Sequence, residues 1–197
     1  MEQTTTTVPG LRYQADYLSS VEQTEFLDII ERQPWITDLK RRVQHYGYRY
    51  NYTHRTVDPE MYLGPLPEWA AGLAERLHGD GFVVRTPDQL IVNEYEPGQG
   101  ISSHVDCVPC FGDTILSLSL GSPCVMLFTR VKSAEKVPIL VEPGSLVVMQ
   151  DDARYAWKHS IPPRKTDVYQ DRTIQRGRRV SLTFRNIVLS SAPIPGP

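Results

Sequence analysis

The spacing of apolar and polar residues changes partway along the chain. Across residues 16–35 and 66–81, apolar positions recur every three or four residues, which is the period of an amphipathic helix. From Gln89 onward they come in short runs rich in Val, Leu and Ile, separated by Pro, Gly and Asp. The pattern therefore predicts helices towards the N-terminus and strands in the remainder.

The first predicted helix has signals at both ends. Either Ser19 with Glu22 or the next pair along fits a capping box, and Pro34 ends the helix. Three apolar residues are expected on its buried side, namely Val21, Leu27 and Ile30. Gly79 and Gly81 mark the end of the second helix.

The strand-rich part contains runs at residues 89–100, 114–130, 137–150, 154–160 and 178–189. An earlier alternating run at 42–55 predicts a strand that passes into an exposed loop. Many short strands without intervening helices are typical of an antiparallel sandwich or barrel. The polar segment 162–177 is expected to be an exposed loop, and residues 1–10 a loose tail.

Composition is that of an ordinary globular protein. The chain has 197 residues, 40% hydrophobic and 22% charged, with a net charge of −2, which suits a single domain at 1–197. A nucleic-acid partner would therefore need a local basic face. The three cysteines do not make a secreted disulfide framework. The first residues lack the basic and then apolar pattern of a signal peptide, and no apolar run approaches the length of a membrane span, so we expect neither. A cytoplasmic location is expected.

The stretch ISSHVDCVPCFGD, residues 101–113, offers two chemistries. Cys107 and Cys110 form a C-x-x-C, which is typical of a redox pair or half of a zinc site. A redox pair normally opens a helix in a βαβ setting, and a zinc site needs four ligands. Here the pair lies between predicted strands with only Cys124 remaining. We therefore expect two small, partly buried residues in a loop near an active site.

The same stretch contains an H-x-D motif. His104 and Asp106 are two residues apart, so on a strand they point to the same face. His159 lies on a later strand-like run and can approach from a neighbouring strand. Two histidines and one carboxylate on one face of a metal form the facial triad of non-haem Fe(II) oxygenases. The alternative is that His159 only makes a hydrogen bond in the wall of the barrel.

The last predicted strand carries two arginines in phase. Arg179 and Arg185 are six residues apart and share a face. Buried guanidinium groups are costly unless an anion meets them, and arginine suits bidentate carboxylate binding. Arg178 is out of phase and is expected to face solvent or an acidic residue. Asn93 and Tyr95, also two apart, are expected to add neutral hydrogen bonds to the same ligand.

These motifs resemble the AlkB family of Fe(II)/2-oxoglutarate dioxygenases. The resemblance runs from about Tyr13 onward and is densest from Asn93 to Arg185, where the H-x-D, the distant histidine and the paired arginines occur in order. The segments RYAWKH, GQGI and HYGYRYNY look most like the branch that hydroxylates wobble uridines in transfer RNA. In that branch the oxygenase is fused to an RNA-recognition module and a methyltransferase, neither of which is seen in this chain.

The resemblance implies an α+β, mainly β fold: a double-stranded β-helix, or jelly roll, at 89–189, with N-terminal helices and a nucleotide-recognition lid at 35–66. It implies that His104, Asp106 and His159 bind Fe(II). Arg179 would pair with the far carboxylate of 2-oxoglutarate, and Arg185 would lie near its iron-chelating end or near Asp106. Asn93 and Tyr95 would complete the cosubstrate pocket, and O2 would be the third reactant.

The resemblance also implies a nucleic-acid substrate, either DNA or RNA, whose alkylated or modified bases are demethylated or hydroxylated. Lysines and arginines surround the tyrosine-rich segment and the region after His159, as phosphate contacts would require. Four residues are expected to contact a base, namely Tyr48, Arg49, Tyr50 and Trp157, although the aromatic residues among them could equally belong to the core. The alternative substrate is a protein side chain. We expect a monomer.

Overall fold

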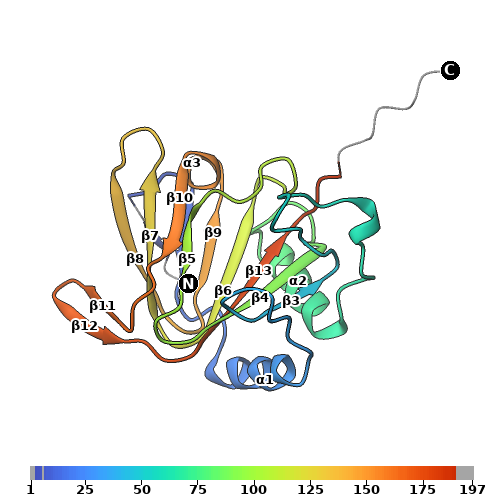
Figure 1. The fold of residues 1–197 in the computed structure, drawn as a ribbon, viewed down its shortest axis with the longest axis horizontal. Helices are drawn as coiled ribbons and strands as arrows, with labels where there is room; N and C mark the ends of the chain where they lie inside the picture. Colours follow the sequence, from blue (N-terminus) through green and yellow to red (C-terminus); the bar gives the residue numbers. More distant parts are fainter. Residues whose placement is uncertain (1–2, 6, 190–197) are drawn as a thin grey trace.

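The computed structural model describes residues 3–5 and 7–189. In these residues two antiparallel sheets form a sandwich (Figure 1). The larger sheet runs in the order β1 (Gln3–Thr5), β2 (Leu11–Gln14), β9 (Leu146–Met149), β6 (Ile115–Gly121), β13 (Arg179–Arg185), β4 (Gln89–Tyr95) and β3 (Val43–Tyr46). The smaller sheet runs β5 (Ile101–His104), β10 (Trp157–Ile161), β7 (Cys124–Arg130) and β8 (Lys136–Val141).

Two helices cover the outer face of the larger sheet. They are α1 (Ser20–Glu31) and α2 (Glu68–Gly79). The predicted capping box is present at Ser19, whose side chain accepts from the Glu22 backbone N–H. Ile30 is fully buried as expected, but Val21 is 65% exposed, so its predicted place on the buried side is wrong.

Strand alternation separates two apolar cores and positions the site. On β13, Val180, Leu182 and Phe184 point to the helices and join the core beneath α1 and α2. The alternate residues, Arg179 to Arg185, face the space between the sheets. Both faces of this central strand are therefore buried, and the polar face is the one aimed at the interior of the sandwich.

The second core fills the sandwich beside this polar face. Met126, Phe128 and Trp157 of the smaller sheet pack there with Val147 and other apolar residues of the larger sheet. Within the described residues, none of the helices combines the length and apolar character needed to cross a membrane.

Three expectations for local structure are corrected. The N-terminal residues are not a loose tail where they are described, because β1 pairs with β2 and Val8 is buried. Residues 162–177 are not an irregular loop but contain a hairpin of β11 (Thr166–Tyr169) and β12 (Arg172–Gln175). The run at 154–160 begins in a short helix, α3 (Asp151–Tyr155), and becomes a strand only at Trp157.

The expected lid at 35–66 includes β3, which belongs to the larger sheet. The part between β3 and α2 forms an irregular cover beside the sandwich, and we call residues 47–66 the lid. It contains a 3-10 turn at Pro59–Met61 and isolated bridges between Asn51 and Thr56 and between Tyr48 and Tyr62. Gly47 at its start has φ +76°, and a Cβ there would lie 1.9 Å from the Asp88 carbonyl oxygen. Glycine is therefore required where β3 turns into the lid.

Candidate active site

A cavity of about 320 Å³ opens between the two sheets. Its floor comes from alternate residues of β4 and β13, one wall from β5 and β10, and its rim from the lid. The three proposed metal ligands, both in-phase arginines, Asn93 and Tyr95 all line it. The structure thus brings together the residues that the motifs singled out.

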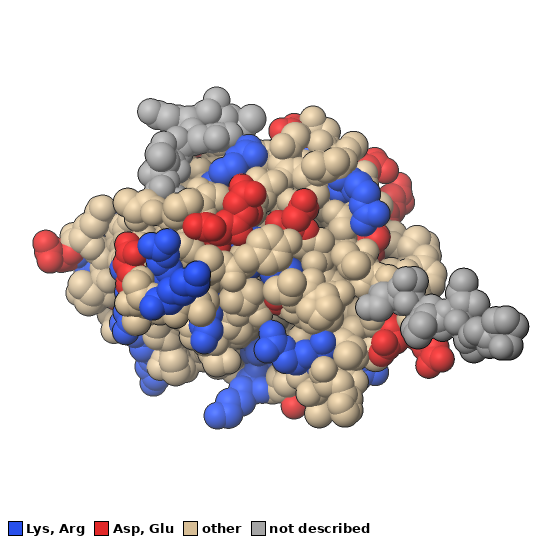
Figure 2. Space-filling model, turned by 90° about the horizontal axis from the view of Figure 1, so that it is seen from above, with Lys and Arg blue, Asp and Glu red and all other residues tan. Residues whose placement is uncertain are grey.

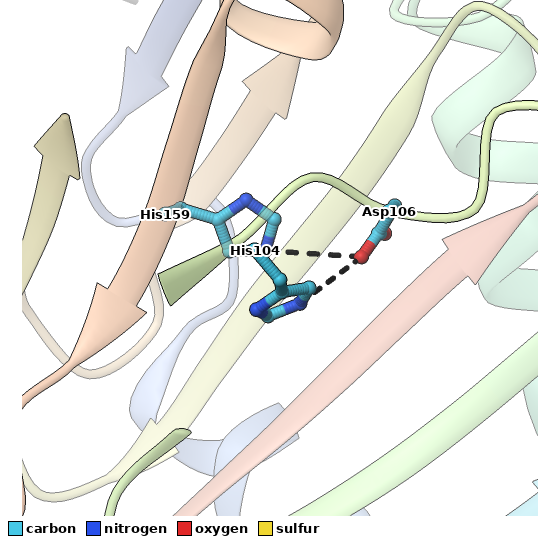
Figure 3. Close-up of side chains that lie close together, drawn as sticks. All are labelled: His104, Asp106 and His159. Carbon is cyan, nitrogen blue, oxygen red and sulfur yellow. Dashed lines mark ion pairs between the residues drawn. The ribbon is translucent and has the colours of Figure 1, made fainter. Parts of the chain in front are cut away.

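His104, Asp106 and His159 converge at one point of the cavity (Figure 3). His104 and His159 face each other across the antiparallel pair β5–β10, as direct register partners. Asp106 lies two residues beyond the end of β5, with Oδ1 3.3 Å from His104 Nε2 and 3.9 Å from His159 Nε2. One ligand atom from each residue lies within 4.8 Å of the others.

The protonation of this cluster suits a metal ion. The Nδ1 of His104 lies 2.7 Å from the Ser102 carbonyl oxygen; because a carbonyl only accepts, Nδ1 carries the proton and Nε2 is left to coordinate. Burial lowers the pKa of His159 to about 4, which keeps this imidazole neutral. Burial raises the pKa of Asp106, but the positive charge of Arg185 outweighs burial and holds that pKa well below its usual value.

Asp106 is fixed from two directions. Arg185 Nε donates to Asp106 Oδ2 at 3.0 Å, and Arg185 Nη1 donates to the Gln89 side chain at 3.3 Å. Arg154 on α3 is 2% exposed, and its guanidinium donates to the carbonyl oxygens of Asp106, Cys107, Phe111 and Gly112. Arg154 therefore holds the loop that carries the Asp106 carboxylate through the backbone carbonyl oxygens of that loop. Sequence reasoning missed Arg154, because backbone acceptors leave no motif.

Arg179 is buried with two of its three guanidinium nitrogens unpaired. Nη2 donates to Ser119 Oγ at 2.7 Å, whereas Nε and Nη1 are buried without a hydrogen-bond partner. An unpaired buried guanidinium is costly, so an anion fits at this position. Asn93 and Tyr95 line the same end of the cavity, and Arg179 lies over the Tyr95 ring with 5.5 Å between guanidinium carbon and ring centre. Arg178, as expected from its phase, instead pairs with Glu94 and Glu31.

The lid contributes aromatic and cationic groups to the rim. Tyr50, Tyr52 and Arg55 of the lid line the cavity, together with Arg41, which lies just before β3. Arg41 Nε donates to the Asn93 Oδ1 at 2.9 Å, and the Tyr52 hydroxyl is buried without a hydrogen-bond partner. Tyr52 was not singled out from the sequence, although its spacing of two from Tyr50 in an extended segment would have placed both on one face.

The four residues expected to contact a base lie in different surroundings. Tyr50 lines the cavity, whereas Tyr48 contacts Tyr62 in a tilted arrangement with ring centres 4.9 Å apart, and Arg49 is exposed. Trp157 is 2% exposed and packs in the core of the sandwich rather than in the cavity. The expectation that Trp157 binds substrate is therefore corrected: its strand position directs the indole inward, where apolar burial is favourable.

Cys107 and Cys110 lie in the loop after Asp106, buried and close to the site, as expected. The structure joins them in a disulfide, which fits the redox-pair alternative that we set aside from the sequence. Cys124 on β7 is buried and unbonded to another cysteine.

Comparisons with known proteins agree with this geometry. Residues 10–185 match the model of the 2OG-Fe(II) oxygenase superfamily. The chain is 37% identical to the alkylated DNA repair protein ALKBH8 homolog of Arabidopsis thaliana over 91% of its length, and spans 59% of that protein. It is 38% identical to the mouse tRNA (carboxymethyluridine(34)-5-O)-methyltransferase ALKBH8, of which it spans 30%. It is also 38% identical to protein L905 of Acanthamoeba polyphaga mimivirus, of which it spans 82%.

Solved structures share the fold at lower identity. The structure of OsALKBH1 superposes with a TM-score of 0.69 at 17% identity, covering 94% of this chain and all of that one. A 2OG-Fe(II) oxygenase from Burkholderia pseudomallei superposes with a TM-score of 0.60 at 16% identity, covering 89% of this chain and 83% of that one. The expected fold class, mainly β with a double-stranded β-helix, is confirmed.

Proposed function

Because this chain belongs to the AlkB family within the 2OG-Fe(II) oxygenase superfamily, we propose that it oxidises alkylated or modified bases of DNA or RNA. Its class as an Fe(II)- and 2-oxoglutarate-dependent oxygenase follows from the family and the residues of the cavity. The base as substrate rests on the names of its relatives, which include an alkylated DNA repair protein homolog, a tRNA methyltransferase and, at 27% identity, a DNA N6-methyl adenine demethylase of Caenorhabditis elegans.

The residues of the cavity fit both cofactors. Two neutral imidazoles and one carboxylate are the donor set of non-haem Fe(II) oxygenases. The Nε and Nη1 of Arg179 are buried without hydrogen-bond partners, so this guanidinium suits an anion such as a carboxylate of 2-oxoglutarate. When bound, Fe(II) with 2-oxoglutarate and O2 supplies the oxidation of a substrate C–H bond, with succinate and CO2 as co-products. The protein supplies orientation and access.

We assign roles to the residues accordingly. His104, Asp106 and His159 hold the metal, and Arg185 keeps Asp106 ionised and oriented. Arg179 binds the far carboxylate of 2-oxoglutarate. Because the Oδ1 of Asn93 accepts from Arg41, its amide nitrogen is left to donate to the cosubstrate, and Tyr95 lines the same cavity.

The rim of the cavity supports a base as the substrate. Tyr50 and Tyr52 offer ring faces, and Arg41 and Arg55 offer positive charge at the same opening. Aromatic rings bind bases by stacking, and cations meet the phosphate backbone. A base held in a duplex cannot reach a cavity between two sheets, so it must be extruded or taken from a single strand.

The proposal is tested by measuring turnover with a panel of candidate substrates. Succinate formation is measured with methylated DNA, with RNA carrying modified uridines, and with peptides, and each product is weighed by mass spectrometry. Formaldehyde release identifies oxidation at a carbon bonded to nitrogen, and a stable gain of one oxygen identifies hydroxylation of a side chain. Stimulation by peptides alone would contradict the proposal and favour a protein substrate.

The metal assignment has its own test. His104→Ala and Asp106→Ala each remove one of three protein ligands and are expected to abolish Fe(II)-dependent turnover of 2-oxoglutarate. Lys158→Ala, which alters an exposed neighbour of His159, serves as the control and retains turnover. Full turnover in both ligand variants would overturn the assignment.

A further inference from the structure

The cysteine pair lies where the active-site loop meets the lid, and the proposed reaction uses neither sulfur. Cys107 directly follows Asp106, and Cys110 is three residues later, with their Cα atoms 5.3 Å apart. Both side chains are buried, at 5% and 3% exposure. Cys107 lines the cavity, which gives a small molecule a route to its sulfur.

Both sulfurs point at one atom of the lid. Cys107 Sγ and Cys110 Sγ each lie 3.2 Å from the carbonyl oxygen of Arg55. Arg55 has φ +54° and closes the turn bridged by Asn51 and Thr56. Its side chain reaches back, with Nη2 donating to the Val105 carbonyl oxygen at 3.0 Å. The tip of the lid is thus docked on the loop that carries Asp106.

The oxidation state of the pair decides whether this contact is attractive. A thiol is a weak hydrogen-bond donor and can donate to the Arg55 carbonyl oxygen. A disulfide has no proton, so the same two sulfurs then face that oxygen without donating. Oxidation therefore removes up to two hydrogen bonds between loop and lid while the Cα atoms can stay where they are, because 5.3 Å lies within the range that a disulfide spans.

The contacts that hold Asp106 do not depend on the oxidation state of the two cysteines. Arg154 holds the carbonyl oxygens of Asp106, Cys107 and Phe111, and these bonds involve no sulfur. Arg185 holds the Asp106 carboxylate itself. The consequence of oxidation therefore falls on the lid.

We propose that Cys107 and Cys110 form a site of reversible oxidation by peroxide, and that its state controls how firmly the lid docks. Cys107 sulfur attacks one oxygen of hydrogen peroxide, the O–O bond breaks, and water leaves with the thiol proton, giving a sulfenic acid. Cys110 sulfur then attacks Cys107 sulfur, the S–O bond breaks, and a second water leaves. Two thiols are oxidised to one disulfide and one peroxide is reduced to two waters. A small dithiol reverses the step.

The first experiment identifies the chemistry. The full chain is loaded with Mn²⁺ in place of Fe²⁺, because Fe²⁺ itself reacts with peroxide and thiols bind the hard Mn²⁺ weakly. After reduction it is treated with hydrogen peroxide and dimedone, which labels sulfenic acid. Cys110→Ser should accumulate label on Cys107, whereas the wild-type chain should form the disulfide with little label. Cys107→Ser should form no disulfide and take up no dimedone label. Cys124→Ser should behave as wild type.

The second experiment reads the lid without any substrate. Trypsin can cut after the exposed residues Arg49 and Arg55. The oxidised protein should be cut there roughly threefold to tenfold faster than the reduced protein, as expected for the loss of one or two weak hydrogen bonds. Cutting elsewhere serves as the internal reference for global unfolding.

Two double variants separate the donor from the sulfur. Serine at both positions keeps a hydroxyl donor, so its lid should be cut slowly with or without peroxide. Alanine at both positions has no donor, so its lid should be cut fast in either condition. Equal rates for the oxidised and reduced wild-type chain, or dimedone label on Cys110 in place of Cys107, would overturn the proposal. Both readouts are independent of the base as substrate, so a failure here is distinguishable from a failure of the proposed function.

Discussion

Arg179 and Arg185 occupy the same face of β13 but meet different demands. Arg185 is compensated by Asp106 and Gln89, so its charge is neutralised within the protein. Arg179 has Ser119 as its hydrogen-bond partner and two further buried nitrogens without one. The alternation of the strand explains why both reach the cavity, and the difference in partners explains why Arg179 is the one left to bind a ligand.

At Arg179 the charge and the geometry can be separated by substitution. Arg179→Lys keeps the positive charge and loses the paired donors. A charge-assisted hydrogen bond is worth ~1.5–3 kcal/mol, so the dissociation constant for 2-oxoglutarate should rise roughly tenfold to a hundredfold, while metal binding persists. Calorimetric titration of the Mn²⁺-loaded chain with 2-oxoglutarate measures the dissociation constant of the cosubstrate. Titration of the metal-free chain with Mn²⁺ measures metal binding.

Arg178→Lys is the matched control, one residue away and directed at Glu31 and Glu94. It should leave the affinity for 2-oxoglutarate unchanged. If Arg178→Lys weakened 2-oxoglutarate binding and Arg179→Lys did not, the cosubstrate role of Arg179 would be wrong.

Arg154 is a positioning residue that acts through backbone. Arg154→Ala leaves four carbonyl oxygens of the Asp106 loop without their charged donor. The free energy of unfolding should fall by at least about 2 kcal/mol, because buried acceptors lose their partner. The variant should also bind Mn²⁺ more weakly in titration, since Asp106 is no longer held in place. Unchanged metal affinity in a folded Arg154→Ala protein would count against a positioning role.

The residues of the site differ in how far the sequence could predict them. His104 with Asp106 and Arg179 with Arg185 are local spacings on strands, and spacing fixes the face. His159 needed only a neighbouring strand, which β10 provides. Arg154 and Tyr52 depend on long-range packing of a loop and a lid, which no local period records. Trp157 was expected to contact a base because it is aromatic and near His159 in the sequence, but its side chain packs in the core of the sandwich.

Among the elements, those with local signals were predicted and those fixed by tertiary contacts were not. The capping box set the start of α1, and apolar runs set β4, β6 and β13. The β11–β12 hairpin was read as a loop because its sequence is polar. Its anchor is Asp167, a buried carboxylate that accepts from Arg176, Arg164 and the Val125 backbone N–H.

Asp167→Asn should release the hairpin while leaving the sandwich folded. The amide cannot compensate the buried Arg176, so the amide hydrogens of β11 and β12 should exchange at least tenfold faster. Asp171→Asn, at the exposed turn of the same hairpin with φ +61°, is the control, because asparagine tolerates that conformation. Hydrogen exchange with mass spectrometry measures both, and equal protection in the two variants would contradict the anchor.

The same carboxylate gives the hairpin a pH dependence. Burial raises the pKa of Asp167, but its hydrogen bonds with Arg176 and the Val125 N–H outweigh burial and lower that pKa below its ordinary value. The stabilisation is therefore complete above the unfolded pKa of about 3.9 and is lost as pH falls through the lower folded pKa. Exchange from β11–β12 of the wild-type chain should stay slow at pH 5 and accelerate only below about pH 4, whereas Asp167→Asn should show no such step.

At the scale of the whole molecule, charge is unevenly distributed although the net value is only −2. Figure 2 shows groups of Lys and Arg over the lower left of the face seen from above, with Asp and Glu gathered over its upper part. A polyanion would be attracted to such a face even though the average charge repels it. The fold of the sandwich follows from apolar spacing, but the distribution of charge over the surface depends on tertiary folding, which the sequence pattern did not show.

The salt dependence of nucleic-acid binding tests this distribution. Arg49 lies exposed in the lid beside Tyr50, and Arg130 lies at the end of β7, paired with Glu135 at 3.9 Å. If Arg49 contacts a phosphate, Arg49→Ala should lower the slope of log affinity against log salt by about 0.7 for single strands, through the release of one fewer counterion. Fluorescence anisotropy with a labelled single-stranded oligonucleotide measures the slope across salt. Arg130→Ala should leave the slope unchanged, because its charge is already met by Glu135 and lies away from the lid segment. If Arg130→Ala changed the slope of log affinity against log salt and Arg49→Ala did not, the nucleic acid would bind along the smaller sheet and not along the lid.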